Sequence, residues 1–296
     1  MASGIVIIDK PSGWTSMDVC AKIRGILKEK RVGHGGTLDP MATGVLPVLI
    51  GRATKILDFL PVHDKRYTAQ AQLGLTSDTL DIWGEVRPTG CATFPSREEV
   101  AAALLPFRGD ILQVPPMTSA LKRDGVRLYE LARQGVEIER QARRITIYSL
   151  ELLDYDREKG LLTLDCACSK GTYIRSLCDD IGRALGCGGV MSGLRRSMAA
   201  GFGLDNCVTL ENARELAAQN RLSERLLSTE AALTTYPCIT VTDAQAARFR
   251  HGGALDLERL REEITGITRI HAPDDSFIGL GEPENGQCRV RYLAEI

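Results

Sequence analysis

The chain has 296 residues, of which 44% are hydrophobic, 25% charged and 5% aromatic, a composition typical of a globular protein with one large domain or two unequal ones. Its 37 Lys and Arg residues against 38 Asp and Glu residues give a formal net charge of −1, so no overall field attracts a polyanion. Only four aliphatic residues precede Asp9 and Lys10, and no later run approaches the roughly 18 apolar residues of a membrane span. We expect a cytoplasmic protein with no membrane partner.

The first 60 residues predict a strand, a helix and a glycine-rich loop, in that order. Residues 4–8 are aliphatic, and Thr15 or Ser16 can cap a helix. The apolar positions of that helix recur at helical spacing, at Met17, Cys20, Ile23 and Ile26 or Leu27. Residues 33–51 then contain five Gly and two Pro with almost no charge, which predicts a loop leading into the apolar run 45–50.

The elements predicted between residues 67 and 186 alternate between strands and helices. Polar and apolar residues alternate over 67–73, and Ser96 with Glu99 forms a capping box. The further predictions are a helix from the capping box through Leu105, a helix over 126–134 ended by Gly135, paired strands 144–153 and 161–168 joined by the turn 154–160, and a helix from Thr172 ended by Gly186.

The C-terminal third differs from the rest of the chain in its predicted elements, which are short and separated by turn residues. A charged helical segment over 210–227 is the predicted connector, and a short helix over 243–250 follows. Three β-like runs separated by Pro, Asp, Asn and Gly then occupy 266–271, 277–281 and 288–293. We predict a division into residues 1–232 and a β-rich unit of residues 233–296, which is small enough to depend on docking to the larger part.

Nine cysteines form no C-x-x-C pair. Cys166 and Cys168 would share one face of a strand, but a tetrahedral zinc site usually combines two such clusters at spacings that this chain lacks. We therefore expect reduced, mostly buried thiols and no metal.

The neutral total hides an uneven distribution of charge. Residues 1–60 carry 8 basic and 5 acidic groups, 122–144 carry 7 and 4, and 170–196 carry 5 and 2, so each of these segments is +3. Residues 205–296 carry 10 basic and 15 acidic groups, which gives −5. Solvated helix faces are one interpretation, and three basic segments converging on one phosphate-binding surface are the other.

Residues 33–40, GHGGTLDP, form the segment most suggestive of chemistry. Its glycines let the backbone approach a ligand closely, and Pro40 biases Asp39 away from helical geometry, which fixes the direction of the carboxylate. The segment lacks the lysine and the glycine spacing of nucleotide-binding loops. Asp39 is therefore either a catalytic carboxylate or the first residue of a stabilising Asx turn.

GHGGTLDPMATG at 33–44, continued by VLPVLIGRATK at 45–55, closely resembles the signature of the TruB family of pseudouridine synthases. Further segments match that family in the same order, over about 190 residues. They are KRY at 65–67, Gly74, TSDTLDIWG at 76–84, VPPMTSA at 114–120, KGTYIR at 170–175 and GLRRS at 193–197.

The resemblance implies an α+β fold. Its catalytic domain would have a mixed, mainly antiparallel sheet flanked by helices, an RNA-clamping insertion over about 115–144, and a small β-rich PUA-like C-terminal domain. It also implies isomerisation of uridine 55 in the T-loop of tRNA to pseudouridine. The uracil is detached at its glycosidic bond, turned, and rejoined through carbon 5, so the reaction requires no cofactor and no metal.

The family pattern assigns catalytic roles to three residues. It places the essential carboxylate at Asp39, which would attack the anomeric carbon or remove the 2′ proton of the sugar. Arg175 matches the arginine that pairs with this aspartate, and such a cation would lower the pKa of the carboxyl group. Tyr67 matches the aromatic residue that stacks on the flipped base. A surface arginine and an exposed strand tyrosine are the alternatives.

The same pattern assigns contacts with the substrate. Tyr173 and Leu194 correspond to residues that line the uracil pocket, although Leu194 alone would be interpreted as core. His34 corresponds to a histidine beside the flipped nucleotide, with a structural histidine as the alternative. The candidates for RNA phosphate contacts are Lys10, Lys55, Lys122, Arg123, Arg195 and Arg196.

The leading hypothesis is a stand-alone, monomeric enzyme that acts on the T-arm of tRNA without a protein partner. The chain has no long basic tail, which disfavours a dyskerin-type enzyme directed by a guide RNA. A tRNA-folding chaperone without catalysis is the third possibility, and the presence of Asp39, Tyr67 and Arg175 argues against it.

Overall fold

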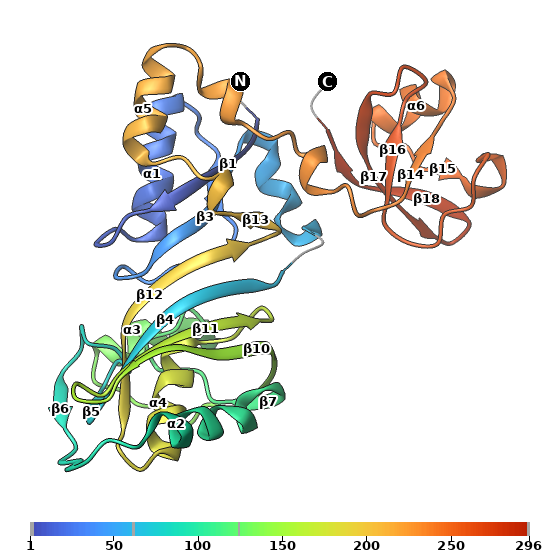
Figure 1. The fold of residues 1–296 in the computed structure, drawn as a ribbon. Helices are drawn as coiled ribbons and strands as arrows, with labels where there is room; N and C mark the ends of the chain where they lie inside the picture. Colours follow the sequence, from blue (N-terminus) through green and yellow to red (C-terminus); the bar gives the residue numbers. More distant parts are fainter. Residues whose placement is uncertain (1–2, 61–62, 124, 295–296) are drawn as a thin grey trace.

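The computed structural model describes residues 3–60, 63–123 and 125–294. Within these residues one sheet has nine strands, seven of which form a continuous path (Figure 1). In spatial order these are β1 (Gly4–Lys10), β3 (Thr43–Ile50), β12 (Gly189–Ala199), β4 (Lys65–Leu73), β11 (Leu161–Cys168), β10 (Arg143–Asp156) and β7 (Gly109–Gln113). The pair β3–β12 is parallel and the other pairs on this path are antiparallel. The predicted mixed, mainly antiparallel sheet is therefore confirmed.

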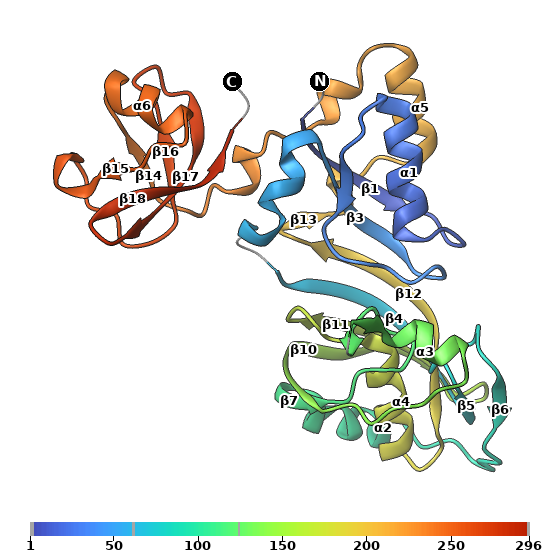
Figure 2. The ribbon, with the colours of Figure 1, turned by 180° about the vertical axis from the view of Figure 1, so that it is seen from behind.

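Helices flank both ends of this sheet. α1 (Ser16–Leu27) and α5 (Leu210–Ala218) pack together beside β1 and β3, whereas α2 (Arg97–Leu104) and α4 (Ile174–Ala184) lie against the half formed by β4, β10 and β11 (Figures 1 and 2). The N-terminal caps agree with the sequence prediction, because Thr15 caps α1 and Ser96 caps α2 through capping boxes. α4 begins just after Tyr173, so its first turn carries Arg175.

The central strand β12 has no counterpart among the predicted elements. It pairs with β4 over most of its length and with β3 near its end, but its sequence mixes glycine and arginine with few β-branched residues. Short elements are also absent from the prediction: β2 (Val32–His34), the 3-10 helix Gly51–Phe59 and β13 (Phe202–Gly203). Tertiary pairing, rather than local propensity, selects the strand conformation at β12.

Two small units extend from the β4–β7 half of the main sheet. One is the hairpin of β5 (Leu75–Ser77) and β6 (Val86–Pro88), whose connection carries residues 78–85. The other contains β8 (Lys122–Arg123), β9 (Val126–Arg127) and α3 (Leu128–Arg133). The predicted helix over 126–134 begins two residues late because Val126 and Arg127 pair with β8 instead.

Residues 238–293 build a second sheet. Its strands are ordered β14 (Cys238–Thr240), β16 (Thr268–His271), β17 (Phe277–Glu284), β18 (Gln287–Leu293) and β15 (Leu255–Asp256), with α6 (Asp243–Arg250) packed beside them. The predicted helix over 243–250 is confirmed, and β16, β17 and β18 coincide with the three predicted β-like runs. The sheet has its own core, in which Phe249 and Ile270 are fully buried.

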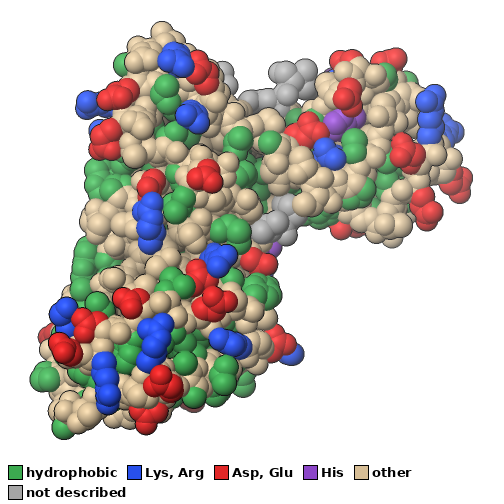
Figure 3. Space-filling view, viewed as in Figure 1, with side chains coloured by type: hydrophobic (Ala, Val, Ile, Leu, Met, Phe, Trp, Pro, Cys, Tyr) green, Lys and Arg blue, Asp and Glu red, His purple; other side chains and the backbone are tan. Residues whose placement is uncertain are grey.

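This C-terminal lobe contacts the main body through a shared apolar cluster. Leu280 and Tyr292 of the lobe pack with Ile5 and Leu49 of the main sheet. Figure 3 shows the lobe projecting from the main body, with acidic and basic side chains intermixed on the face in view. Among the described residues, none of the helices combines the length and the apolar character needed to cross a membrane.

Candidate active site

A cavity of about 1470 Å³ opens between the main sheet, the β5–β6 hairpin and the segment that carries α3. Its walls come from segments far apart in the chain: residues 37–41, 77–83, 112–122, 127–140 and 175–183. Several apolar side chains of the wall are exposed to solvent, at Met17, Trp83, Leu112, Val114 and Val136. Apolar side chains combined with a few polar groups are typical of a ligand pocket.

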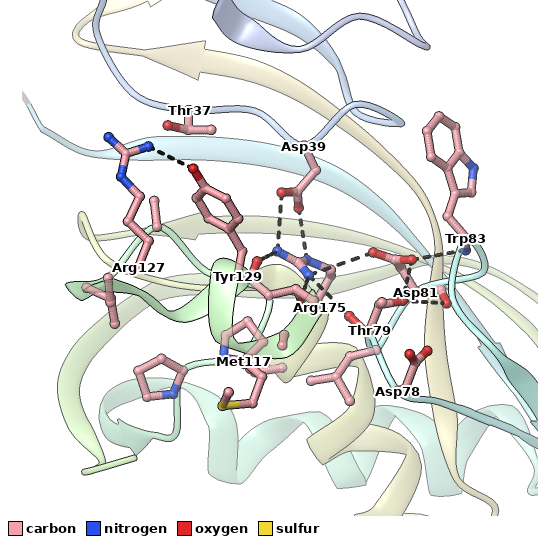
Figure 4. A pocket seen from close by; sticks show the side chains of 18 of the residues that line it. Thr37, Asp39, Asp78, Thr79, Asp81, Trp83, Met117, Arg127, Tyr129 and Arg175 are labelled. Atoms are coloured by element: carbon pink, nitrogen blue, oxygen red, sulfur yellow. Dashed lines mark hydrogen bonds and ion pairs between the residues drawn. The ribbon is translucent and has the colours of Figure 1, made fainter. Parts of the chain in front are cut away.

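Asp39 and Arg175 meet inside this cavity (Figure 4). The Arg175 Nε lies 2.9 Å from Asp39 Oδ2, and its Nη2 donates to Asp39 Oδ1 at 3.2 Å. This bidentate geometry fixes the plane of the carboxylate. Arg175 is itself buried and donates to the carbonyl oxygens of Thr79 at 3.2 Å and Thr118 at 3.0 Å, and to the hydroxyl of Thr118.

Asp81 is a second carboxylate of this network and is not among the site residues predicted from the sequence. Its Oδ2 lies 3.8 Å from Arg175 Nη1, and its Oδ1 accepts hydrogen bonds from Thr79 Oγ1 at 2.8 Å and Trp83 N at 3.0 Å. Figure 4 shows Arg175 between the two carboxylates. The signal for Asp81 in the sequence is the segment TSDTLDIWG at 76–84, which does not by itself show which of its two aspartates enters the site.

The electrostatic balance at Asp39 differs from the sequence expectation. Desolvation in the cavity raises the pKa of Asp39, and the nearby charge of Asp81 acts in the same direction. Arg175 and Lys10 lower that pKa, but their effect does not outweigh desolvation. The cation beside Asp39 therefore offsets the cost of burying a carboxylate and does not make the group unusually acidic.

Lys10 donates to the backbone beside Asp39 and is not exposed to solvent, so its prediction as a phosphate contact is wrong. It is fully buried, and its Nζ donates to the carbonyl oxygens of Trp14 at 2.6 Å, Pro11 at 2.9 Å and Pro40 at 3.1 Å. Desolvation lowers the pKa of Lys10 to about 8. Three carbonyl acceptors use all the donors of the ammonium group, which leaves none for a phosphate.

Arg196 supports the Asp39 loop from the sheet, and its prediction as a phosphate contact is also wrong. It is fully buried and donates to the carbonyl oxygens of Val45 at 2.7 Å, Gly36 at 3.0 Å and Thr37 at 3.4 Å. Gly44 permits this packing, because it has φ +100° and a Cβ there would lie 2.2 Å from the carbonyl oxygen of Arg196.

Tyr67, Tyr173 and Leu194 do not line the cavity in this structure. Tyr67 is buried opposite Arg196 in the β4–β12 ladder, and desolvation raises its pKa to about 12. Desolvation raises the pKa of Tyr173 as well. Leu194 packs against the main core. Their predicted roles toward a base stay predictions.

His34 does line the cavity. Desolvation, followed by the positive charge of Arg196, lowers the pKa of His34, so the imidazole is neutral at physiological pH. Its Nδ1 is buried and has no hydrogen-bond partner among the residues that the structure describes. A buried polar atom without a partner carries a desolvation cost, and this nitrogen is not exposed to the cavity.

The remaining predicted phosphate contacts lie at the surface. Lys55, Lys122 and Arg123 are exposed, whereas Arg195 is half-exposed and forms an ion pair with Asp9 at 2.8 Å. Four further basic residues, which were not predicted from the sequence, line the cavity: Arg127, Arg133, Arg140 and Arg183.

Tyr129 brings an aromatic ring to this basic wall. The guanidinium carbons of Arg127 and Arg133 lie 5.8 and 5.4 Å from the centroid of the ring, and Figure 4 shows the ring inside the cavity. Aromatic rings interleaved with arginines are suited to a nucleic acid strand.

Comparison with known proteins connects this site to a family. The model described as TruB family pseudouridylate synthase (N terminal domain) matches residues 24–174, and tRNA pseudouridylate synthase B C-terminal domain matches 175–234. The chain belongs to the TruB family. A third TruB model, described as Pseudouridine synthase II TruB, C-terminal, matches 237–293.

Relatives within the TruB family match nearly the whole chain. The tRNA pseudouridine synthase B of Dechloromonas aromatica is 45% identical and covers 96% of this chain and 92% of its own length. The enzyme of the same name from Clostridium perfringens is 42% identical and covers 98% of both chains. A solved structure titled "Crystal Structure of a Cbf5-Nop10-Gar1 Complex" is 26% identical, with a TM-score of 0.73 over 99% of this chain and 84% of that one.

Proposed function

We propose that this protein isomerises uridine to pseudouridine at position 55, in the T-loop of tRNA. The observation that carries the proposal is the bidentate Asp39–Arg175 pair inside the cavity of a TruB family member. The names of the relatives, tRNA pseudouridine synthase B, support tRNA as the substrate.

The geometry supports a division of labour between the residues of the site. Asp39 is the group that reacts at the sugar, either by attacking the anomeric carbon or by removing the 2′ proton. Arg175 orients its carboxylate, and Asp81 with the carbonyl oxygens of Thr79 and Thr118 holds Arg175 in place. The bond from carbon 1′ to N1 breaks, a bond to carbon 5 forms, and carbon 5 loses its proton while N1 gains one.

The target uridine has to leave its stack to reach Asp39, and the cavity wall supplies the replacement contacts. Apolar side chains such as Trp83 and Met17 are exposed there, and His34 also lines the cavity. Stacking and hydrogen bonding to the extruded nucleotide offset the cost of flipping. We propose that Tyr67 stacks on the flipped base and that Tyr173 and Leu194 line the pocket that holds the uracil.

We further propose that the enzyme works as a cytoplasmic monomer without a protein partner or a guide RNA. Exposed Lys122 and Arg123 beside the cavity, and Lys55 farther along the surface, are the remaining phosphate contacts. The proposal also includes a division of the chain between residues 232 and 233 and an RNA-clamping role for residues 115–144. The separate core of the second sheet and the match of a third family model to 237–293 support the division.

The test is an unmodified T-arm minihelix incubated with the purified protein, without a guide RNA, in buffer without added cofactor. We expect one uridine to be converted to pseudouridine, detected by mass spectrometry and by reverse-transcription stops after carbodiimide treatment. Asp39→Asn should reduce conversion by at least about 10³-fold, with RNA affinity within a few-fold of the unmodified protein.

The matched control is Asp58→Asn, an exposed aspartate of the 3-10 helix Gly51–Phe59, which should leave conversion unchanged. Conversion that strictly requires a guide RNA would establish the dyskerin-type alternative. Binding and refolding of tRNA without any conversion would establish the chaperone.

A further inference from the structure

We propose that Cys91 and Cys187 form a reversible disulfide site that joins the loop after β6 to the turn between α4 and β12. The two Sγ atoms lie 2.6 Å apart, although 96 positions separate the residues in the chain. The inference concerns neither the substrate nor the residues around Asp39.

The backbone imposes the contact between these two segments. The amide of Thr89 donates to the carbonyl oxygen of Gly74 at 2.9 Å, and the amide of Gly74 donates to the carbonyl oxygen of Gly188 at 3.3 Å. The hydroxyl of Thr89 donates to the carbonyl oxygen of Cys187 at 2.6 Å. The residue two places before Cys91 is therefore hydrogen-bonded to Cys187 itself, which holds the two cysteine-bearing segments against each other.

The two thiols differ in access to solvent. Cys187 is buried, and burial raises its pKa to about 11, whereas Cys91 is half-exposed. Cys91 is therefore the thiol that meets a dissolved oxidant first. With hydrogen peroxide the Cys91 sulfur is oxidised to a sulfenic acid and releases one water. The Cys187 thiol then displaces the hydroxyl as a second water, and a dithiol reductant restores both thiols.

A competing pair is less suited to the same reaction. Cys166 and Cys168 lie two residues apart on β11 and are both buried. Residues i and i+2 of a strand are about 6.6 Å apart with parallel side chains, near the upper limit for a disulfide. Linking them would bend a strand in the middle of the main sheet.

The disulfide would lie far from Asp39, but it would join the two segments that carry Arg175 and Asp81. Cys187 follows the last turn of α4, whereas Arg175 lies in the first turn, about 16 Å away along an 11-residue helix. Cys91 follows the hairpin that brings Asp81 to the cavity. A bond between them closes a loop of nearly 100 residues, which restricts the unfolded chain strongly.

The test treats the full-length protein with hydrogen peroxide and then titrates thiols after denaturation. We expect two of the nine thiols to disappear, a peptide pair joined through Cys91 and Cys187 to appear in the mass spectrum, and dithiothreitol to reverse both changes. The oxidised form should have a Tm higher by about 5–10 °C.

Cys91→Ser should abolish the crosslink and the shift in Tm, whereas Cys238→Ser, a half-buried cysteine of the C-terminal lobe, should leave both intact. Oxidation that stops at a sulfinic acid on Cys91, or a disulfide between Cys166 and Cys168, would overturn the proposal. None of these measurements depends on turnover, so their failure is distinguishable from a failure of the proposed function.

Discussion

The loop that carries Asp39 and the segment that carries α3 line the same cavity, yet they use their cations in opposite ways. In the first region Lys10 and Arg196 are fully buried and donate to backbone carbonyl oxygens. In the second, Lys122 and Arg123 are exposed, with one guanidinium nitrogen of Arg123 bonded to the carbonyl oxygen of Glu139. Buried cations build the scaffold, and exposed cations remain available to an RNA backbone.

The largest effect is expected at the cation that contacts Asp39. Arg175→Ala should lower single-turnover conversion by at least about 100-fold, because it removes the bidentate contact and leaves Asp39 facing Asp81. RNA affinity, measured by filter binding, should change by only a few-fold. Undiminished conversion would remove Arg175 from the proposed mechanism.

A buried scaffold cation should be costly to the fold itself. Arg196→Met leaves three carbonyl oxygens of the Asp39 loop without their donor, so we expect a loss of about 2–4 kcal/mol in the free energy of unfolding. Denaturant unfolding measures this loss. Arg195→Met is the matched control on the same strand, since the half-exposed pair with Asp9 should contribute less than about 1 kcal/mol. Equal losses would refute the distinction.

Exposed cations should affect binding and little else. In the double variant Lys122→Ala, Arg123→Ala we expect KM for the minihelix to rise a few-fold with kcat nearly unchanged. The salt dependence of binding should flatten by about 0.7–0.9 in log–log slope for each lost phosphate contact. Arg259→Ala, at an exposed position of the C-terminal lobe, should leave the slope for the minihelix unchanged. A drop in kcat with an unchanged slope would contradict the assignment.

The smallest effect concerns pH. The pKa of Asp39 is raised, and the proposed mechanism requires an ionised carboxylate, so conversion should decline on acidification at a higher pH than for an ordinary aspartate. Asp81→Asn removes a neighbouring negative charge, so it should lower the pKa of Asp39 and move this decline to lower pH. Single-turnover rates from pH 4 to 8 measure the shift, and an upward movement would reverse our interpretation of Asp81.

The sequence correctly predicts features that depend on neighbouring residues, such as the starts of helices. Capping residues such as Thr15 and Ser96 mark helix starts because their side chains satisfy amides that the helix leaves free. The pairing of Asp39 with Arg175 was expected only through the family resemblance. Nothing local indicates that residues 136 positions apart in the chain meet in one cavity.

The errors arise where burial decides the role of a residue. Arg195 and Arg196 are neighbours with the same side chain, yet one faces solvent and the other is fully buried. Adjacent residues of a strand point to opposite faces. The different burial of Arg195 and Arg196 could therefore be predicted only if β12 were recognised as a strand, and the composition of residues 189–199 does not indicate one. Lys10 ends a strand whose burial is nearly complete, and charge alone suggested a surface position.

The support of the Asp39 loop depends on β12, a strand that is made late in synthesis. This strand joins β3 to β4, and Arg196 within it holds the loop of residues 36–45. A nascent chain that ends before residue 189 already contains Asp39 and Arg175 but lacks the strand between the two halves of the sheet. Contacts between such distant residues form late in folding. We therefore expect the growing polypeptide to stay inactive on the ribosome until residue 199 has emerged, well after Asp39 has been made.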